Sequence, residues 1–346
     1  MLILHTADLH LTSKDPSRLQ TLDWIINKTN EIKADCLVVA GDLFDSDTEG
    51  TILRTEVRKI FEKSKSKIFL LPGNHDLESY GSNYDYGKNT QQLINKPFEI
   101  FFCNNIKFLA IPFQPKKFSE CIMDLSEDVD IIIAHGTLYD LSILPVLNVE
   151  DIEYMPIYPA DLKNHCRIAL LGHIHSTYLE LDYDTLKIIY SGTPIALNTK
   201  CRTPRKISLI EINKKNIVVN SIEVEIAQYW KELNYFVFPG NEEKVLNQIE
   251  QELSDFAGKN ILPNITVQGF IAGNEIEFKK EIAKIKEKYQ REFIEIALDC
   301  DEIQSWDRVL KNPFVRRFIE RTQHLPDALR MKIFELTFPH FAEMIR

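Results

Sequence analysis

The stretch CLVVAGDLFD, residues 36–45, joins a short apolar run to a polar cluster. A second stretch, IFLLPGNHD at residues 68–76, has the same form. Short runs rich in Val, Ile and Leu are typical of strands covered on both faces. Ligands of open α/β sheets bind beyond the carboxyl ends of the strands, so we predict an α/β fold with its functional site where these runs end.

The same pattern extends over the first two thirds of the chain. Three further strand-like runs cover residues 2–4, 131–134 and 168–171. Apolar residues at helical spacing after Pro16, and again over 52–61, predict helices that connect strands. Four closely spaced runs within 178–219 predict an antiparallel or mixed sheet.

The rhythm changes near residue 226, which predicts a second domain. Strands over 235–238, 264–271 and 293–298 alternate with helices over 242–256 and 275–289. Two further helical stretches cover 307–322 and 326–338. We therefore predict a first domain over 1–225, a smaller α+β capping domain over 226–303 and a helical segment over 304–346.

Composition narrows the class of protein. The chain has 346 residues, 44% of them hydrophobic, and no apolar run reaches the roughly 20 residues of a membrane helix. Six cysteines without a CxxC pair favour reduced, buried thiols, and we expect a cytoplasmic protein without a membrane partner. The net charge of −10 by itself disfavours nucleic acid as a substrate, because phosphate contacts need basic patches.

Five polar clusters follow strand-like runs and carry five of the nine histidines. Their residue types suit a metal centre, because carboxylate and amide oxygens mixed with imidazole nitrogens favour manganese, iron or zinc. There are more candidate ligands than one ion needs, so two ions sharing a bridging carboxylate are expected. His5, His165, His324 and His340 lie outside the pattern and are expected to be ordinary core or surface histidines. The clusters are Asp8-Leu9-His10, Gly41-Asp42-Leu43-Phe44-Asp45, Gly73-Asn74-His75-Asp76, His135-Gly136 and Gly172-His173-Ile174-His175.

In this order, DxH, GDxFD, GNHD, HG and GHxH, the clusters resemble those of the calcineurin-like binuclear metallophosphoesterases, over roughly residues 1–225. GDLFD followed by LPGNHD, and later LGHIHSTYLELD at 171–182 with IIYSGTPIALN at 188–198, is similar to DNA double-strand-break repair nucleases of the Mre11/SbcD type. The resemblance implies a four-layer αββα sandwich with a DNA-recognising cap, and exonuclease and endonuclease activity on phosphodiesters.

The resemblance also implies a role for each cluster. The first metal would be held by Asp8, His10, Asp42 and His175, and the second by Asp42, Asn74, His135 and His173, with Asp42 as the bridge. Manganese is expected first, with magnesium, iron or zinc as alternatives. His75 would protonate the leaving oxygen, and Asp76 would hold His75 or a neighbouring loop.

DNA contacts are expected at local basic clusters, of which the stretch after YSGTP is preferred: Lys200, Arg202, Arg205 and Lys206. In the resembled family, helices corresponding to 51–63 and 89–94 form a homodimer, and a helical C-terminal element docks on a coiled-coil ABC ATPase of the SbcC/Rad50 type. The apolar stripes of the last two helices also suit simple packing on the second domain. Two other functions stay open: a calcineurin-like phosphodiesterase or phosphatase acting on small phosphoesters, and a non-catalytic scaffold.

Overall fold

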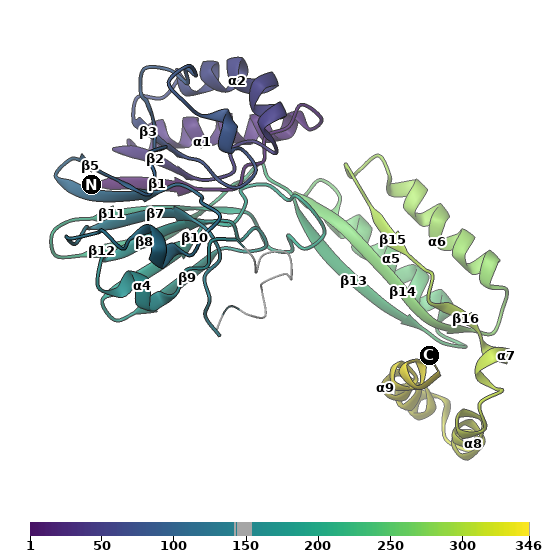
Figure 1. Cartoon of the computed structure of the whole chain (residues 1–346). Coiled ribbons are helices and arrows are strands. Elements are labelled where there is room, and N and C mark those ends of the chain that lie inside the picture. Colours follow the sequence, from purple (N-terminus) through teal and green to yellow (C-terminus); the bar gives the residue numbers. More distant parts are fainter. Residues whose placement is uncertain (142, 144–153, 346) are drawn as a thin grey trace. The chain divides into compact units, whose positions relative to one another are not determined.

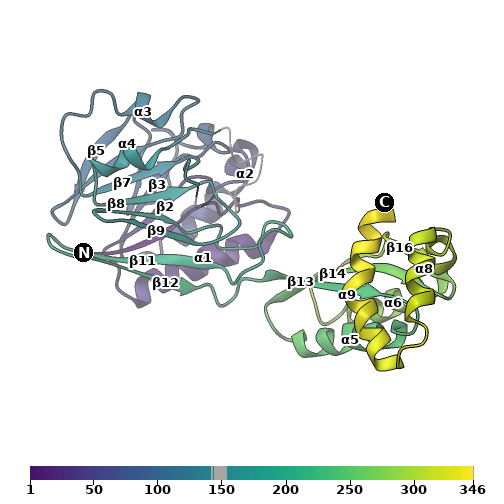
Figure 2. The same cartoon turned by 90° about the horizontal axis from the view of Figure 1, so that it is seen from below.

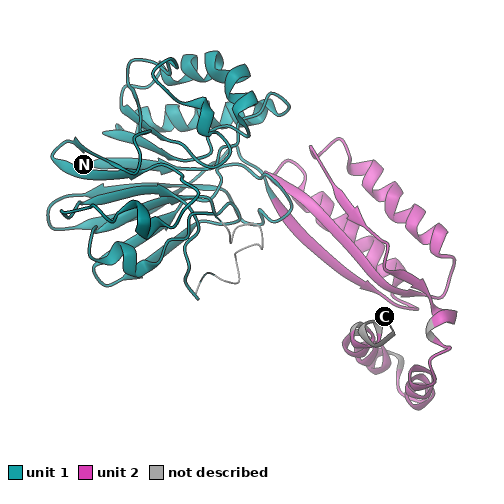
Figure 3. Cartoon of the chain, in the orientation of Figure 1, with its two compact units in different colours: residues 1–229 teal, residues 230–346 magenta. Residues whose placement is uncertain are grey.

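The structure is a computed structural model that describes residues 1–141, 143 and 154–345 (Figure 1). The chain divides into two compact units, Met1–Tyr229 and Trp230–Arg346, which are coloured separately in Figure 3. The predicted domain limits at residues 225 and 303 stay predictions. None of the described helices is long and apolar enough to cross a membrane.

The first unit contains two six-stranded sheets. The first has the order β12 (Ile217–Glu223), β11 (Lys206–Ile212), β1 (Leu2–Thr6), β2 (Cys36–Ala40), β3 (Lys67–Leu71) and β4 (Thr90–Gln92). The second has the order β5 (Glu99–Cys103), β6 (Ile106–Ile111), β7 (Ile131–His135), β8 (Ile168–Gly172), β10 (Leu186–Tyr190) and β9 (Leu179–Tyr183). Strands β1 to β4 run parallel, as do β6, β7, β8 and β10.

The two sheets face each other across a core that includes Val38 and Phe69 from the first sheet and Ile133 and Leu170 from the second. The outer face of the first sheet packs against α1 (Pro16–Glu31) and α2 (Asp47–Phe61) (Figure 1). The outer face of the second packs beside α3 (Phe118–Cys121) and α4 (Pro159–Lys163), which are labelled in Figure 2. Strands buried on both faces explain the continuous apolar runs. The predicted four-layer α/β sandwich is confirmed.

Helix starts follow capping rules. Asp15 accepts a hydrogen bond from the backbone N–H of Ser17 before α1, and Ser46 accepts one from that of Glu49 before α2. Such caps satisfy backbone donors that a helix leaves unpaired. A short 3-10 helix, Leu77–Ser79, follows the third cluster.

The expected helix over residues 89–94 is wrong. Those residues contain strand β4, which pairs in parallel with β3, and Leu93 continues the contact by donating its N–H to the carbonyl of Leu70 at 2.8 Å. A helix here would leave the edge of β3 without hydrogen-bond partners, which the strand supplies.

The four runs within 178–219 form mixed sheets as predicted, but they divide between the two sheets. Strands β9 and β10 belong to the second sheet, whereas β11 returns to pair antiparallel with β1, for example Leu4 with Leu209. The segment between them, residues 191–205, therefore passes from one sheet to the other beside the functional clusters.

The second unit has a four-stranded sheet of β13 (Tyr229–Val237), β14 (Ile261–Ile271), β15 (Ala297–Asp299) and β16 (Ile303–Ser305). Helices α5 (Glu242–Phe256) and α6 (Glu275–Tyr289) pack on one face through the core around Val237 and Ile265. Helices α7 (Trp306–Val309), α8 (Pro313–Thr322) and α9 (Asp327–Ile345) follow. Phe338 of α9 contacts Phe238 and Phe270 of the sheet region, so part of the apolar stripes packs on this unit (Figure 2).

Candidate metal centre

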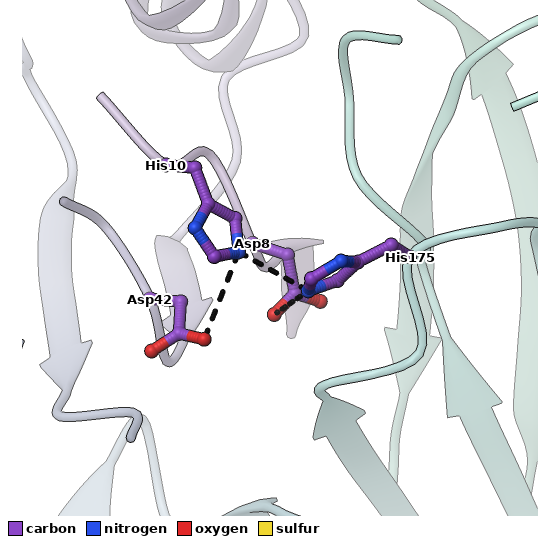
Figure 4. A group of neighbouring side chains, drawn as sticks. All are labelled: Asp8, His10, Asp42 and His175. Atoms are coloured by element: carbon purple, nitrogen blue, oxygen red, sulfur yellow. Dashed lines mark hydrogen bonds and ion pairs between the residues drawn. The ribbon is translucent and has the colours of Figure 1, made fainter. Parts of the chain in front are cut away.

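The fold brings the five clusters together. They follow β1, β2, β3, β7 and β8, whose carboxyl ends meet at one edge of the facing sheets. Figure 4 shows Asp8, His10, Asp42 and His175 pointing toward one another. Their ligand atoms all lie within 4.8 Å of one another, a spacing that could hold a metal ion. These are the four residues that the resemblance assigns to the first metal.

Individual distances show how tightly this group is packed. The Nε2 atoms of His10 and His175 lie 3.1 Å apart. Nε2 of His175 lies 3.6 Å from Oδ1 of Asp8, and Nε2 of His10 lies 3.7 Å from Oδ2 of Asp42. Two carboxylates and two imidazoles thus present unshared electron pairs to one space, the donor set expected for a transition metal.

The remaining predicted ligands lie on the other side of Asp42. Nε2 of His135 is 3.3 Å from Oδ2 of Asp42 and 2.9 Å from Oδ1 of Asn74. The rings of His135 and His173 are 5.3 Å apart between centroids. Oδ2 of Asp42 therefore faces imidazoles of both predicted sets, the position that a bridging ligand needs.

Several of these buried atoms lack hydrogen-bond partners among the described residues. They include Oδ2 of Asp42 and both ring nitrogens of His173. Buried polar groups are normally satisfied, so unpartnered donor atoms converging on one place fit a bound cation. Nδ1 of His135 instead contacts the carbonyl of Ala40 at 2.9 Å, which leaves its Nε2 to face Asp42 and orients the ring.

Charges within the group are strongly coupled. Burial alone would raise the pKa of Asp42, but the charge of His135 holds it well below its usual range. Burial opposes the charged form of His135, yet the carboxylate of Asp42 raises its pKa to about 9. Burial, and then the charge of His135, lowers the pKa of His173 to about 3, which keeps that imidazole neutral, the form that binds metals.

The backbone at four of the predicted ligands has positive φ angles. Asp8, His10, Asp42 and His173 have φ angles of 55°, 45°, 47° and 107°, in the left-handed region. Such conformations cost of order 1–3 kcal/mol each and persist where surrounding contacts enforce them. Here the N–H groups of Asp8 and His10 donate to the carbonyls of Gly41 and Asp42, at 3.1 and 3.0 Å.

Glycines beside the ligands allow close approach between ligand residues. A Cβ atom at Gly41 would overlap the ring of His135, and one at Gly73 would overlap the carboxylate of Asp42. Gly41 also has a φ of +97°, a conformation that favours glycine. These two glycines therefore make room for the side chains of neighbouring ligands.

His75 lies exposed at the edge of the group. Its backbone N–H donates to Oδ1 of Asp42 at 2.9 Å, its Nδ1 lies 3.2 Å from the carbonyl of Asp45, and its ring centroid is 4.8 Å from that of His10. Its side chain thus reaches solvent beside the candidate metal centre, where a proton donor to a substrate would stand.

Asp76 is fully buried and holds the loop rather than His75. Its carboxylate accepts hydrogen bonds from the backbone N–H groups of Gly73 and Phe44 at 2.9 and 3.1 Å, and from the hydroxyl of Tyr80 at 2.8 Å. Burial and the nearby charge of Asp42 raise the pKa of Asp76 to about 7.

Sequence reasoning left the role of Asp45 unassigned. Its Oδ1 lies 3.4 Å from Nδ1 of His10 and 3.7 Å from Nη1 of Arg18, so the carboxylate orients the His10 ring from behind. Its place as the second aspartate of GDLFD, three residues after the predicted ligand Asp42, was the feature of the sequence that could have indicated this role.

The four predicted DNA contacts fall into two environments. Lys200 and Arg202 are exposed, and Lys206 lies over the ring of Tyr178 at 5.8 Å. Arg205 differs, because it is 1% exposed and donates hydrogen bonds to backbone carbonyls. Its Nη2 reaches the carbonyl of His175 at 2.8 Å, so it is a positioning residue of the ligand loop and not an exposed DNA contact.

His5 departs from the expectation of an ordinary core histidine. It is fully buried in β1, and neither ring nitrogen has a partner among the described residues. Burial lowers the pKa of His5 to about 3, although the charge of Asp8 opposes this. His324, by contrast, is exposed as expected.

Comparison with known proteins places this centre in a family. The model of the calcineurin-like phosphoesterase family matches residues 1–177, which contain every cluster from Asp8 to His175. The fold is similar to that of an archaeal phosphodiesterase, at 15% identity over 64% of this chain and 100% of that one, with a TM-score of 0.35. It is also similar to that of a dimetal phosphatase from Danio rerio, at 10% identity over 65% and 96% of the two chains, with a TM-score of 0.44.

A third similar structure is Vps29 of Entamoeba histolytica in complex with zinc, at 13% identity over 65% and 99% of the two chains, with a TM-score of 0.29. The family match covers just over half of the chain and ends beyond the last cluster. The chain therefore belongs to the calcineurin-like phosphoesterase family and is a metallophosphoesterase.

Proposed function

We propose that this metallophosphoesterase is a DNA nuclease of the Mre11/SbcD type, with exonuclease and endonuclease activity. Two divalent ions, manganese first, would be held by the two ligand sets that share Asp42. Such ions offset the charge of the phosphodiester and lower the pKa of a bound water. The donor set of carboxylate, amide and imidazole groups supports the assignment of a transition metal such as manganese.

His75 supplies the proton in this proposal. The carbonyl of Asp45, 3.2 Å from Nδ1, can only accept a hydrogen bond, so Nδ1 carries a proton. The imidazolium form can then donate from Nε2 to the leaving oxygen of the phosphodiester. General-acid steps of this kind contribute typically 10²–10⁴-fold to a rate.

One observation favours an extended polyanion over a small phosphoester. Nε, Nη1 and Nη2 of Arg205 donate to the carbonyls of Thr193, Ser176 and His175, at 2.9, 2.9 and 2.8 Å. This anchors the segment that carries the exposed Lys200 and Arg202 to the loop of His175. Cations tethered beside the candidate metal centre suit the phosphates that flank a scissile bond.

The proposal is tested with the purified chain and manganese or magnesium chloride, on labelled linear duplex DNA and on bis-p-nitrophenyl phosphate. Metal-dependent cleavage of both substrates is expected. Substituting Lys200→Glu and Arg202→Glu together should weaken DNA binding and reduce its salt slope by about 2, with little effect on the small ester. Cleavage of the small ester without any DNA cleavage would instead favour a small-molecule phosphodiesterase.

We also propose the two protein partners that the resemblance implies, a second copy of this chain and a coiled-coil ABC ATPase. Ile52 of α2 is an exposed apolar residue on the first unit. Phe314 of α8 and Leu329 and Leu336 of α9 are exposed on the second. Light scattering tests the homodimer, which Ile52→Glu should dissociate, and co-purification with the ATPase tests the other contact, which Leu336→Glu should weaken.

A further inference from the structure

A hollow of about 450 Å³ lies in the first unit, lined in part by Phe113, Lys116, Lys117, Glu120, Tyr154 and Met155. We call this hollow the aromatic pocket. Its volume falls within the range of about 300–1,000 Å³ that is usual for small-ligand sites. Lys116 and Lys117 form one of the local basic clusters at which DNA contacts are expected, whereas the sequence assigned no function to the other four residues.

The aromatic pocket adjoins the candidate metal centre. The ring of Tyr154 lies 5.1 Å from that of His173 between centroids. The N–H of Phe113 donates to the carbonyl of Pro72 at 3.2 Å, directly before the Gly73-Asn74 turn. Phe113 follows β6, which is parallel to β7, so the pocket opens at the same sheet edge as His135.

Neighbouring contacts hold the walls in place. The N–H of Phe118 donates to the carbonyl of Pro156 at 3.2 Å, which ties the two segments of the pocket together. The side chain of Gln114 is buried and donates to the carbonyl of Pro97 at 2.8 Å. The rings of Phe113 and Tyr154 are 6.0 Å apart and inclined by 50°, and the Tyr154 side chain is 38% exposed, so a planar ligand can reach it.

The chemistry of the walls indicates the kind of ligand. The exposed ring of Tyr154 offers a stacking surface, and the buried ring of Phe113 packs beside it. Among the described lining residues, Lys116 and Lys117 outweigh Glu120 and give a net positive charge. A planar ring joined to a phosphate matches both features. A nucleotide has this composition, and base stacking on aromatic side chains tolerates any base.

We propose that the aromatic pocket binds the base of a nucleotide at the scissile phosphodiester, stacked on Tyr154, with Lys116 and Lys117 facing its phosphate side. The choice of a nucleotide rests on the proposed nuclease function. The pocket then selects nucleotide esters over other phosphoesters, and it receives an unpaired base in preference to a paired one, because a paired base is stacked within its duplex.

The test is a fluorescence titration of the full chain, in magnesium chloride, with 2-aminopurine deoxyriboside 5′-monophosphate, whose emission falls on stacking. We expect saturable quenching by the wild type. Tyr154→Ala should weaken binding about fivefold or more, since stacking contributes about 1–3 kcal/mol per base, and Tyr154→Phe should retain it. Tyr158→Ala is the matched control, because Tyr158 is 44% exposed and lies outside the pocket lining.

A second comparison separates base from phosphate. Replacing Lys116 and Lys117 by Ala should weaken binding of the monophosphate more than that of the free 2-aminopurine deoxyriboside. Absence of quenching by the wild type, or equal binding by wild type and Tyr154→Ala, would overturn the proposal. If Tyr154-dependent binding is found without DNA cleavage, the nuclease function fails while the pocket assignment stands. If DNA is cleaved but nucleotide binding does not depend on Tyr154, the pocket assignment fails while the nuclease function stands.

Discussion

Nη2 of Arg205 donates a hydrogen bond to the backbone carbonyl of His175 at 2.8 Å, across 30 residues of sequence. A buried guanidinium thus holds the loop that ends the last ligand cluster. Because the planar group also bonds the carbonyls of Ser176 and Thr193, it determines where the His175 imidazole stands relative to Asp8. The metal centre therefore depends on a residue that touches none of its donor atoms.

Replacing Arg205 by Met should weaken metal binding about tenfold or more, the usual cost of losing a group that orients a ligand. The three carbonyls would lose their donor, so the free energy of unfolding should fall by about 3 kcal/mol. Calorimetric metal titration and urea unfolding measure the two effects. Arg202→Met, an exposed change in the same segment, serves as control, and equal metal affinity for both variants would contradict the positioning role.

His75→Ala should lower phosphodiester cleavage about 10²–10⁴-fold while leaving metal content unchanged, because the side chain donates a proton and is not among the proposed ligands. Asp42→Ala should lose both metal and activity, since its Oδ2 faces both ligand sets. Elemental analysis of dialysed protein, together with cleavage rates on bis-p-nitrophenyl phosphate, distinguishes the two variants. Asp124→Ala, an exposed aspartate outside the centre, is the control. Activity retained in His75→Ala would remove the general-acid role.

Gly73→Ala should disturb the bridging position, because the added methyl group would overlap the carboxylate of Asp42. We expect a loss of about 1–3 kcal/mol in the free energy of unfolding, together with weaker metal binding. Gly273→Ala is the matched control, since no heavy atom lies within 4 Å of a Cβ placed there. Similar metal affinities for the two variants would show that the turn tolerates the methyl group.

His5→Leu should make the metal-free protein less sensitive to acid. Burial lowers the pKa of His5 to about 3. Below about pH 6.5, His5 is therefore protonated in the unfolded chain but stays neutral in the folded chain. Stability therefore falls as pH drops through 6.5, and His5 should account for about 2 kcal/mol of the loss between pH 7.5 and 5. Urea unfolding in EDTA at both pH values measures this, with the exposed His324→Leu as control. An unchanged pH dependence in His5→Leu would show that His5 is not the sensitive group.

Strands and candidate ligands could be predicted together because one local pattern encodes both. An apolar run such as 36–40 is covered on both faces, and it must end where Gly41 and Asp42 return the chain to polar surroundings. Residues 90–92 and 99–111 lack this clear ending, and their strands were not predicted. There the partner strand decides the conformation, since β4 forms only beside the edge of β3.

The sequence by itself determined which apolar strands end at the functional clusters, the positions of these clusters and the type of donor atom that each one carries. Only the tertiary structure decided that β11 returns to β1, that Arg205 bonds the His175 loop, and that Tyr154 lies beside His173. It also decided the left-handed backbone of Asp8 and Asp42. The physical reason is the separation of these residues along the chain. Apolar periodicity reflects contacts between near neighbours, whereas these contacts join residues far apart. The conformational free energy that they cost is offset only once the sheets have packed.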